Sequence, residues 1–136
     1  MIIPTLIKSV SAPAVNEKNI FEVVSLVNKN NPEKGQREIN IIIVSDREIR
    51  KINRIYRHKD KITDVLSFIY TKEVGEIYIA YNRACRQAKE KKISVRKEVN
   101  ILLIHGLFHI LGYDHVKNSD AEKMIIKEQQ ILCRLV

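Results

Sequence analysis

Three of the four histidines in the chain lie within eleven residues, in the segment HGLFHILGYDH from 105 to 115. His105 and His109 are four residues apart, so on a helix their side chains lie on one face. His115 would lie roughly 15 Å along the axis from His105 if the same helix continued. Gly112 precedes it, and a glycine there can adopt the left-handed conformation that ends a helix and reverses the chain. The pattern therefore predicts two metal ligands on a helix and a third, His115, that returns after a turn.

Three neutral imidazoles with one open position are typical of a catalytic zinc site. The alternative is a set of core histidines with satisfied hydrogen bonds, which the spacing disfavours. We expect one zinc per chain, although an all-nitrogen site also suits nickel or another divalent metal. A purely structural zinc would require a fourth protein ligand. Asp114 adjoins His115, and we expect it to shape the turn or to hydrogen-bond a ligand from behind.

The residue after the first histidine limits the chemistry. The metzincin proteases share this histidine spacing, but their general base is a glutamate directly after the first histidine. Here that position is Gly106, which argues against peptide hydrolysis. A zinc ion still lowers the pKa of bound water toward ~7 and polarises an oxygen. An RNA phosphodiester needs less help, because its neighbouring 2′-hydroxyl can act as an internal nucleophile.

Composition points to a small, basic, globular protein. The 136 residues suggest one domain, 1–136, with one core. The formal net charge of +8 favours a polyanionic partner, for which RNA is the first candidate, although solubility alone would also explain it. Cys85 and Cys133 are far apart, which fits a reduced cytoplasmic protein, and we expect both to be buried. No apolar run reaches the ~18 residues of a membrane span, so no membrane partner is expected.

Hydrophobic periodicity predicts nine elements in the order β-α-β-α-β-β-α-α-α. The predicted strands are 2–10, 38–45, 64–70 and 76–81, and the predicted helices are 16–31, 45–57, 82–92, 94–111 and 119–136. This order indicates an α+β domain, a small mixed β-sheet covered by helices. The last two strands are expected to be antiparallel because only a short turn at Lys72 to Gly75 joins them.

Three motifs together resemble the YbeY family, bacterial rRNA-maturation factors described as single-strand-specific endoribonucleases. HGLFHILGYDH resembles the family signature, NRIYRHKDKITDVLSF (53–68) is similar to a second family pattern, and GEIYIA (75–80) to a third. The resemblance implies metal ligation by His105, His109 and His115 and a functional role for Arg57. Ile62 stands where the family usually has proline, and the usual proline after Phe68 is absent, which affects loop rigidity near the site.

The resemblance also implies a cellular role. It points to a zinc-dependent endoribonuclease that acts in the cytoplasm in 16S rRNA 3′-end maturation and ribosome quality control. The implied partners are single-stranded RNA or rRNA, the small ribosomal subunit and its assembly factors. Two alternatives stay open: a non-catalytic ribosome-assembly factor with a structural zinc, and a zinc protease.

Arg57 also makes chemical sense. Its planar guanidinium can bind two phosphate oxygens and offset charge that grows in a transition state, although a basic residue is also favoured at any helix C-terminus.

Further substrate-binding candidates are His58, Lys59, Lys61 and Glu76, the last of which is either a strand-edge residue or part of a substrate groove. Thr63, Asp64 and Ser67 match the family pattern and are expected to be structural. Two basic clusters are either RNA-steering groups or solvated helix faces: Arg83, Arg86, Lys89, Lys91, Lys92, Arg96 and Lys97.

Overall fold

The structure is a computed structural model that describes residues 1–33, 35–113 and 118–135, with the backbone alone for 118–120. The predicted order of elements is confirmed, and most ends differ from the prediction by one or two residues. The strands are β1 (Ile2–Lys8), β2 (Arg37–Val44), β3 (Val65–Ile69) and β4 (Val74–Ala80). The helices are α1 (Glu17–Asn30), α2 (Asp46–Arg57), α3 (Tyr81–Lys91), α4 (Val95–Ile110) and α5 (Asn118–Leu132).

The four strands form one mixed sheet in the order β1-β2-β4-β3. β2 pairs in parallel with β1 and with β4, whereas β3 and β4 form the predicted antiparallel pair. The two central strands, β2 and β4, bury Ile39, Ile41, Ile43, Ile77 and Ile79, as expected of strands that pair on both sides and are covered by helices. β3 is an edge strand, so one side of its backbone is left for contacts other than sheet pairing.

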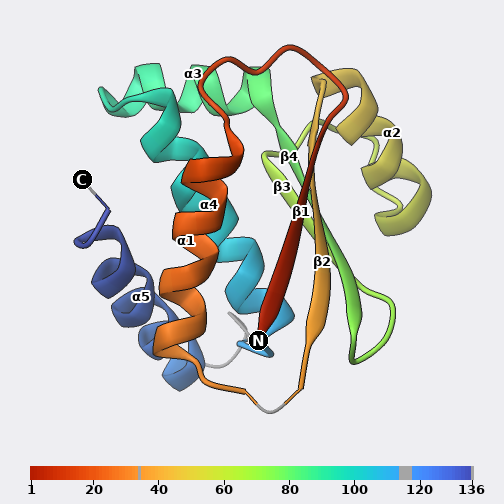
Figure 1. Cartoon of the computed structure of the whole chain (residues 1–136). Helices are drawn as coiled ribbons and strands as arrows, with labels where there is room; N and C mark the ends of the chain where they lie inside the picture. Colours follow the sequence, from red (N-terminus) through yellow and green to blue (C-terminus); the bar gives the residue numbers. More distant parts are fainter. Residues whose placement is uncertain (34, 114–117, 136) are drawn as a thin grey trace.

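The two faces of the sheet are covered unequally (Figure 1). α1 and α4 lie over one face, with α5 packed beside them, and this layer encloses the main core, which includes the fully buried Ile41, Ile79, Leu103 and Phe108. α2 lies on the opposite face, where a small cluster of Val44, Ile49, Leu66 and Ala80 is buried. The rest of that face is left open.

Local capping fixes the ends of the helices that carry the candidate residues. The Ser45 and Ser94 side chains accept hydrogen bonds from the third residues of α2 and α4, which satisfies otherwise unpaired backbone donors. α4 ends as predicted: Gly112 has φ +97° and its N–H donates to the His109 carbonyl, while Tyr113 N–H donates to the Phe108 carbonyl. These two bonds define a Schellman motif, and the Phe108 and Tyr113 rings pack 5.4 Å apart beside it.

One prediction about the cysteines was wrong. Cys85 is partly buried and packs against the main core. Cys133 is exposed, because Ile131 and the partly buried Leu132 and Leu135 occupy the core-facing positions at this end of the chain. Within the part of the chain that the structure describes, no helix is both long and apolar enough to cross a membrane.

Candidate active site

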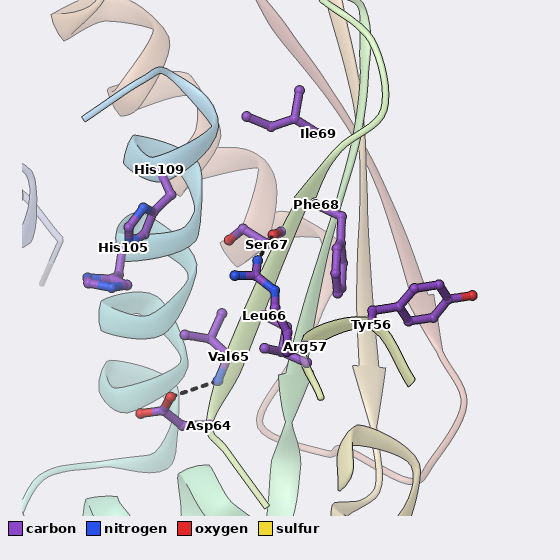
Figure 2. A pocket seen from close by; sticks show the side chains of 10 residues that line it. All are labelled: Tyr56, Arg57, Asp64, Val65, Leu66, Ser67, Phe68, Ile69, His105 and His109. Carbon is purple, nitrogen blue, oxygen red and sulfur yellow. Dashed lines mark hydrogen bonds between the residues drawn. The ribbon is translucent and has the colours of Figure 1, made fainter. Parts of the chain in front are cut away.

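A cleft of about 600 Å³ lies between α4, the edge strand β3 and the C-terminal end of α2. Figure 2 shows its lining side chains, which come from three separate segments of the chain. They are Tyr56, Arg57, Asp64, Val65, Leu66, Ser67, Phe68, Ile69, His105 and His109. The cleft therefore brings two of the three motif histidines together with the candidate arginine.

His105 and His109 project from one face of α4 into this cleft, as their spacing predicts. Their ring centroids are 4.8 Å apart and the ring planes are inclined at 75°, and both residues are partly buried. Asp114 and His115 lie outside the described residues, so the third ligand and the role of Asp114 stay predictions.

Glu128 on α5 adds a carboxylate behind this histidine pair. Its Oε1 lies 3.4 Å from His105 Nδ1, is buried, and accepts no hydrogen bond from the described residues. A carboxylate beside one ring nitrogen is the usual arrangement around a metal-binding imidazole, which then binds the metal through its other nitrogen. Two neighbouring imidazoles, one of them backed by a carboxylate, fit a divalent cation that prefers nitrogen ligands.

The structure explains why a glycine occupies position 106. The residue is buried where α4 crosses the sheet, and a Cβ at this position would lie 3.0 Å from Ile77 Cγ2 and 3.1 Å from Ser67 Oγ. The side of α4 at residue 106 therefore packs against the sheet. A side chain at this position would press on Ile77 and Ser67 already at its Cβ, so packing disfavours a glutamate here, in agreement with the sequence.

Arg57 is held at the cleft by two contacts. Its Nη2 donates a 2.8 Å hydrogen bond to the Ser67 carbonyl, on the unpaired side of β3, and its guanidinium carbon lies 5.2 Å from the Phe68 ring centroid. Figure 2 shows the guanidinium beside β3, between the histidines and Phe68. The last turn of α2 presents this residue, because the chain leaves the helix at His58 in a left-handed conformation (φ 57°).

The further substrate-binding candidates do not line the cleft. His58, Lys59 and Lys61 are exposed on the segment that follows α2, and none of them lines it. Glu76 lies on β4, which has neighbours on both sides. Of its two predicted roles, the strand-edge residue therefore does not apply, and the substrate-groove residue stays a prediction. Its Oε1 accepts hydrogen bonds from the hydroxyls of Tyr70 and Tyr78.

Two of the basic candidates are engaged in ion pairs. Arg86 pairs with Asp46 at 2.8 Å, and Lys91 pairs at 2.8 Å with Glu98, whose side chain is fully buried. Lys91 therefore offsets the cost of burying a carboxylate. This structural role was not visible in the charge pattern.

Sequence reasoning underestimated Asp64 and Ser67. Asp64 was expected to shape a turn, and its Oδ1 does accept a hydrogen bond from Val65 N–H, but the residue also lines the cleft. Ser67 lies between Val65 and Ile69 on the β3 face that meets α4, and its hydroxyl is 3.4 Å from the Gly106 carbonyl. A polar residue at a core-facing strand position was the available signal for Ser67.

The chain is similar to known proteins over nearly its whole length. Residues 7–136 match the family model described as Endoribonuclease YbeY. The Endoribonuclease YbeY of Finegoldia magna is 46% identical over 102 residues, which cover 70% of this chain and 67% of that protein. The Bacillus subtilis relative of the same name is 34% identical over 137 residues, covering 88% and 87%.

A solved structure agrees with these sequence matches. The solution structure of a Thermotoga maritima protein has a TM-score of 0.72 and 27% identity, over 96% of this chain and 87% of that one. The family model and the two relatives lead to the same assignment: this chain belongs to the endoribonuclease YbeY family.

Proposed function

We propose that this protein is a metal-dependent endoribonuclease that cleaves single-stranded RNA. The observation that carries the proposal is the convergence in one cleft of His105 and His109 with Arg57, from segments almost fifty residues apart in the sequence. The names of its relatives support RNA as the substrate. A role in 16S rRNA 3′-end maturation and ribosome quality control in the cytoplasm, with the small ribosomal subunit and its assembly factors as partners, belongs to the same proposal.

His105, His109 and His115 would hold one divalent cation, with zinc as the first candidate. When bound, such an ion acts as a Lewis acid toward a phosphate oxygen or lowers the pKa of a water molecule. Glu128 would orient His105 from behind, since its buried oxygen faces Nδ1.

Arg57 would bind the scissile phosphate and stabilise its growing charge. Its contacts with the Ser67 carbonyl and the Phe68 ring restrict the guanidinium, and a donor fixed in advance loses little entropy when the phosphate binds. Asp64 is the one carboxylate among the described residues that line the cleft. We assign it as the candidate proton acceptor in place of the glutamate that Gly106 excludes.

A cleavage assay tests the proposal. Wild type, His109→Ala, Arg57→Ala and Arg47→Ala would be incubated with a single-stranded rRNA fragment after their folding is checked by circular dichroism. Arg47 is an exposed arginine on the same helix as Arg57, and it serves as the matched control. We expect Arg57→Ala to lose at least about a hundredfold in rate, the scale of a lost transition-state donor. His109→Ala should lose at least as much, because it removes a proposed metal ligand, and Arg47→Ala should cleave like wild type. Equal cleavage by all four proteins would contradict the proposal.

One observation favours a second candidate, a non-catalytic ribosome-assembly factor with a structural metal. Glu128 lies on α5 and His105 on α4, so a metal at His105 would also tie the C-terminal helix to the core. This function predicts a large fall in Tm on chelation, no RNA cleavage, and rRNA binding that survives Arg57→Ala. A zinc protease is disfavoured by the packing around Gly106.

A further inference from the structure

Four of the eight aromatic side chains gather on the open, α2-bearing face of the sheet: Tyr56, Phe68, Tyr70 and Tyr78. Phe68 contacts Tyr56 on one side and Tyr78 on the other, with centroid distances of 5.6 and 5.9 Å in edge-to-face arrangements. The outer members are the most exposed, Tyr56 at 67% and Tyr70 at 59%. We call this set the aromatic surface.

The aromatic surface is not a covered core. α2 buries only the part of this face around Leu66 and Ala80, and it leaves the rings of Tyr56 and Tyr70 in solvent. Phe68 and Tyr78 are partly buried, and Phe68 supports the Tyr56 ring from the side. Tyr70 is held through its hydroxyl, which donates to Glu76. Exposed aromatic rings held in place by their neighbours are the feature on which proteins stack unpaired nucleobases.

Glu76 fixes the orientation of this surface. Its carboxylate accepts hydrogen bonds from the hydroxyls of both Tyr70 and Tyr78, and this contact raises the pKa of Tyr70 to about 12. Burial, together with the same carboxylate, raises the pKa of Tyr78 as well. Both phenols are protonated at neutral pH, as an ordinary tyrosine is, and the raised pKa keeps them donating in more alkaline solution as well.

The charged groups on this surface favour different parts of a nucleotide: the positive group favours phosphate, and the negative group favours the base. Arg57, whose guanidinium lies over Phe68, is a positive group at the border of the aromatic surface. Glu76 is a negative group within it, and a carboxylate repels phosphate but accepts hydrogen bonds from base N–H groups. These charges therefore favour one arrangement of a bound RNA strand, in which a phosphate lies at Arg57 and the bases lie on the tyrosines.

The aromatic surface continues directly into the cleft. Tyr56 and Phe68 belong to it and also line the cleft that holds the two histidines. Figure 2 shows these rings on the other side of β3 from His105 and His109, with Arg57 between the two groups. A strand that crosses the β3 edge at Arg57 would therefore pass from the histidine side to the aromatic side.

From this arrangement we propose that Tyr56 and Tyr70 form a base-stacking subsite for the unpaired nucleotides next to the scissile phosphate. The inference rests on the proposed endoribonuclease function and adds a physical basis for single-strand selectivity, because bases within a duplex are already stacked and cannot lie on these rings.

Stopped-flow binding and steady-state cleavage of a 12-nucleotide single-stranded RNA would test the subsite. Tyr56→Leu and Tyr70→Leu remove one ring each, Tyr70→Phe keeps the ring but loses the hydroxyl, and Phe21→Leu is the control, since Phe21 is an aromatic residue 44% exposed on α1. We expect each tyrosine-to-leucine change to weaken binding about tenfold, within the range measured for one stacked base. The loss should appear in KM rather than in kcat, and Phe21→Leu should bind like wild type. Tyr70→Phe should lose less affinity than Tyr70→Leu, because it keeps the ring and loses only the hydroxyl that donates to Glu76.

Tyr70→Trp gives an independent readout, because the chain contains no tryptophan. Its fluorescence should be quenched by the single-stranded RNA and not by a duplex of equal length. Wild-type affinity in both leucine variants, or no quenching while the RNA is bound, would overturn the subsite and leave the nuclease proposal intact. Failure of the wild type to bind or cleave any single-stranded RNA would overturn both.

Discussion

The two faces of the sheet have opposite characters. On the face covered by α1, α4 and α5, isoleucines of the central strands are fully buried, and the buried Asn19 and Asn100 side chains hydrogen-bond to each other. On the face that carries α2, burial stops at a small cluster and exposed aromatic rings follow. The cleft lies at β3, where the two faces meet. The covered face thus supplies stability and a rigid α4, whereas the open face is left for contacts with other molecules.

The largest expected effect on stability tests this contrast directly. Ile20 on α1 is fully buried in the main core, so Ile20→Ala should lower the free energy of unfolding by about 2–5 kcal/mol. Tyr56→Leu on the open face should lower it by less than about 1 kcal/mol. Urea denaturation would measure both. Similar losses would show that the open face is part of the stabilising core.

Glu128 tests whether the covered face also supports the metal site. Glu128→Gln preserves shape but removes the charge that faces His105. We expect metal affinity to fall about ten- to a hundredfold, as measured by competition with a chromogenic chelator. Glu122→Gln is the control on the same helix. Unchanged affinity in Glu128→Gln would show that its carboxylate does not act on the site.

Gly106 tests how closely α4 must approach the sheet. Gly106→Ala would gain about 1 kcal/mol of helix propensity, but its methyl group would press on the fully buried Ile77, and overpacking costs about 1–3 kcal/mol. We expect a net loss of about 1 kcal/mol in thermal or urea unfolding. If Gly106→Ala were more stable than wild type, the Ile77 and Ser67 side chains would have moved enough to accommodate the added methyl group.

The smallest effect concerns the hydroxyl network of the open face. Because the pKa of Tyr70 is raised to about 12 from an ordinary value of 10.0, any contribution to stability from its proton is present below pH 10 and lost as pH rises through about 12. Ultraviolet titration of tyrosinate should show a late step that is smaller in Tyr70→Phe than in wild type, because Tyr78, whose pKa is also raised, still titrates late in the variant. A Tyr70 that titrates near pH 10 would mean that Glu76 does not hold it.

Much of this arrangement was predictable because it is local. The pairing of His105 with His109 follows from helical spacing, and the helix end at Gly112 follows from the conformational freedom of glycine. The proximity of Arg57 to the histidines was inferred from resemblance alone, since no local pattern shows which strand edge meets α4.

Other features depend on tertiary contacts that separate segments create. Glu128 reaches His105 only because α5 packs beside α4, and Gly106 is explained only by the position of Ile77. The exposure of Cys133 was missed for a related reason, because residue type gave no sign of which side of this C-terminal segment faces the core. The aromatic surface needed the register of β3 against β4, which places Phe68 opposite Glu76.

The most direct test of the central claim is metal removal and restoration on a single preparation of the full chain. Metal content and single-stranded RNA cleavage would be measured before chelation, after chelation and after stepwise addition of zinc. We predict that cleavage disappears with the metal and returns in proportion to added zinc, with saturation at about one ion per chain. Undiminished cleavage by metal-free protein that remains folded would contradict a metal-dependent site at His105 and His109.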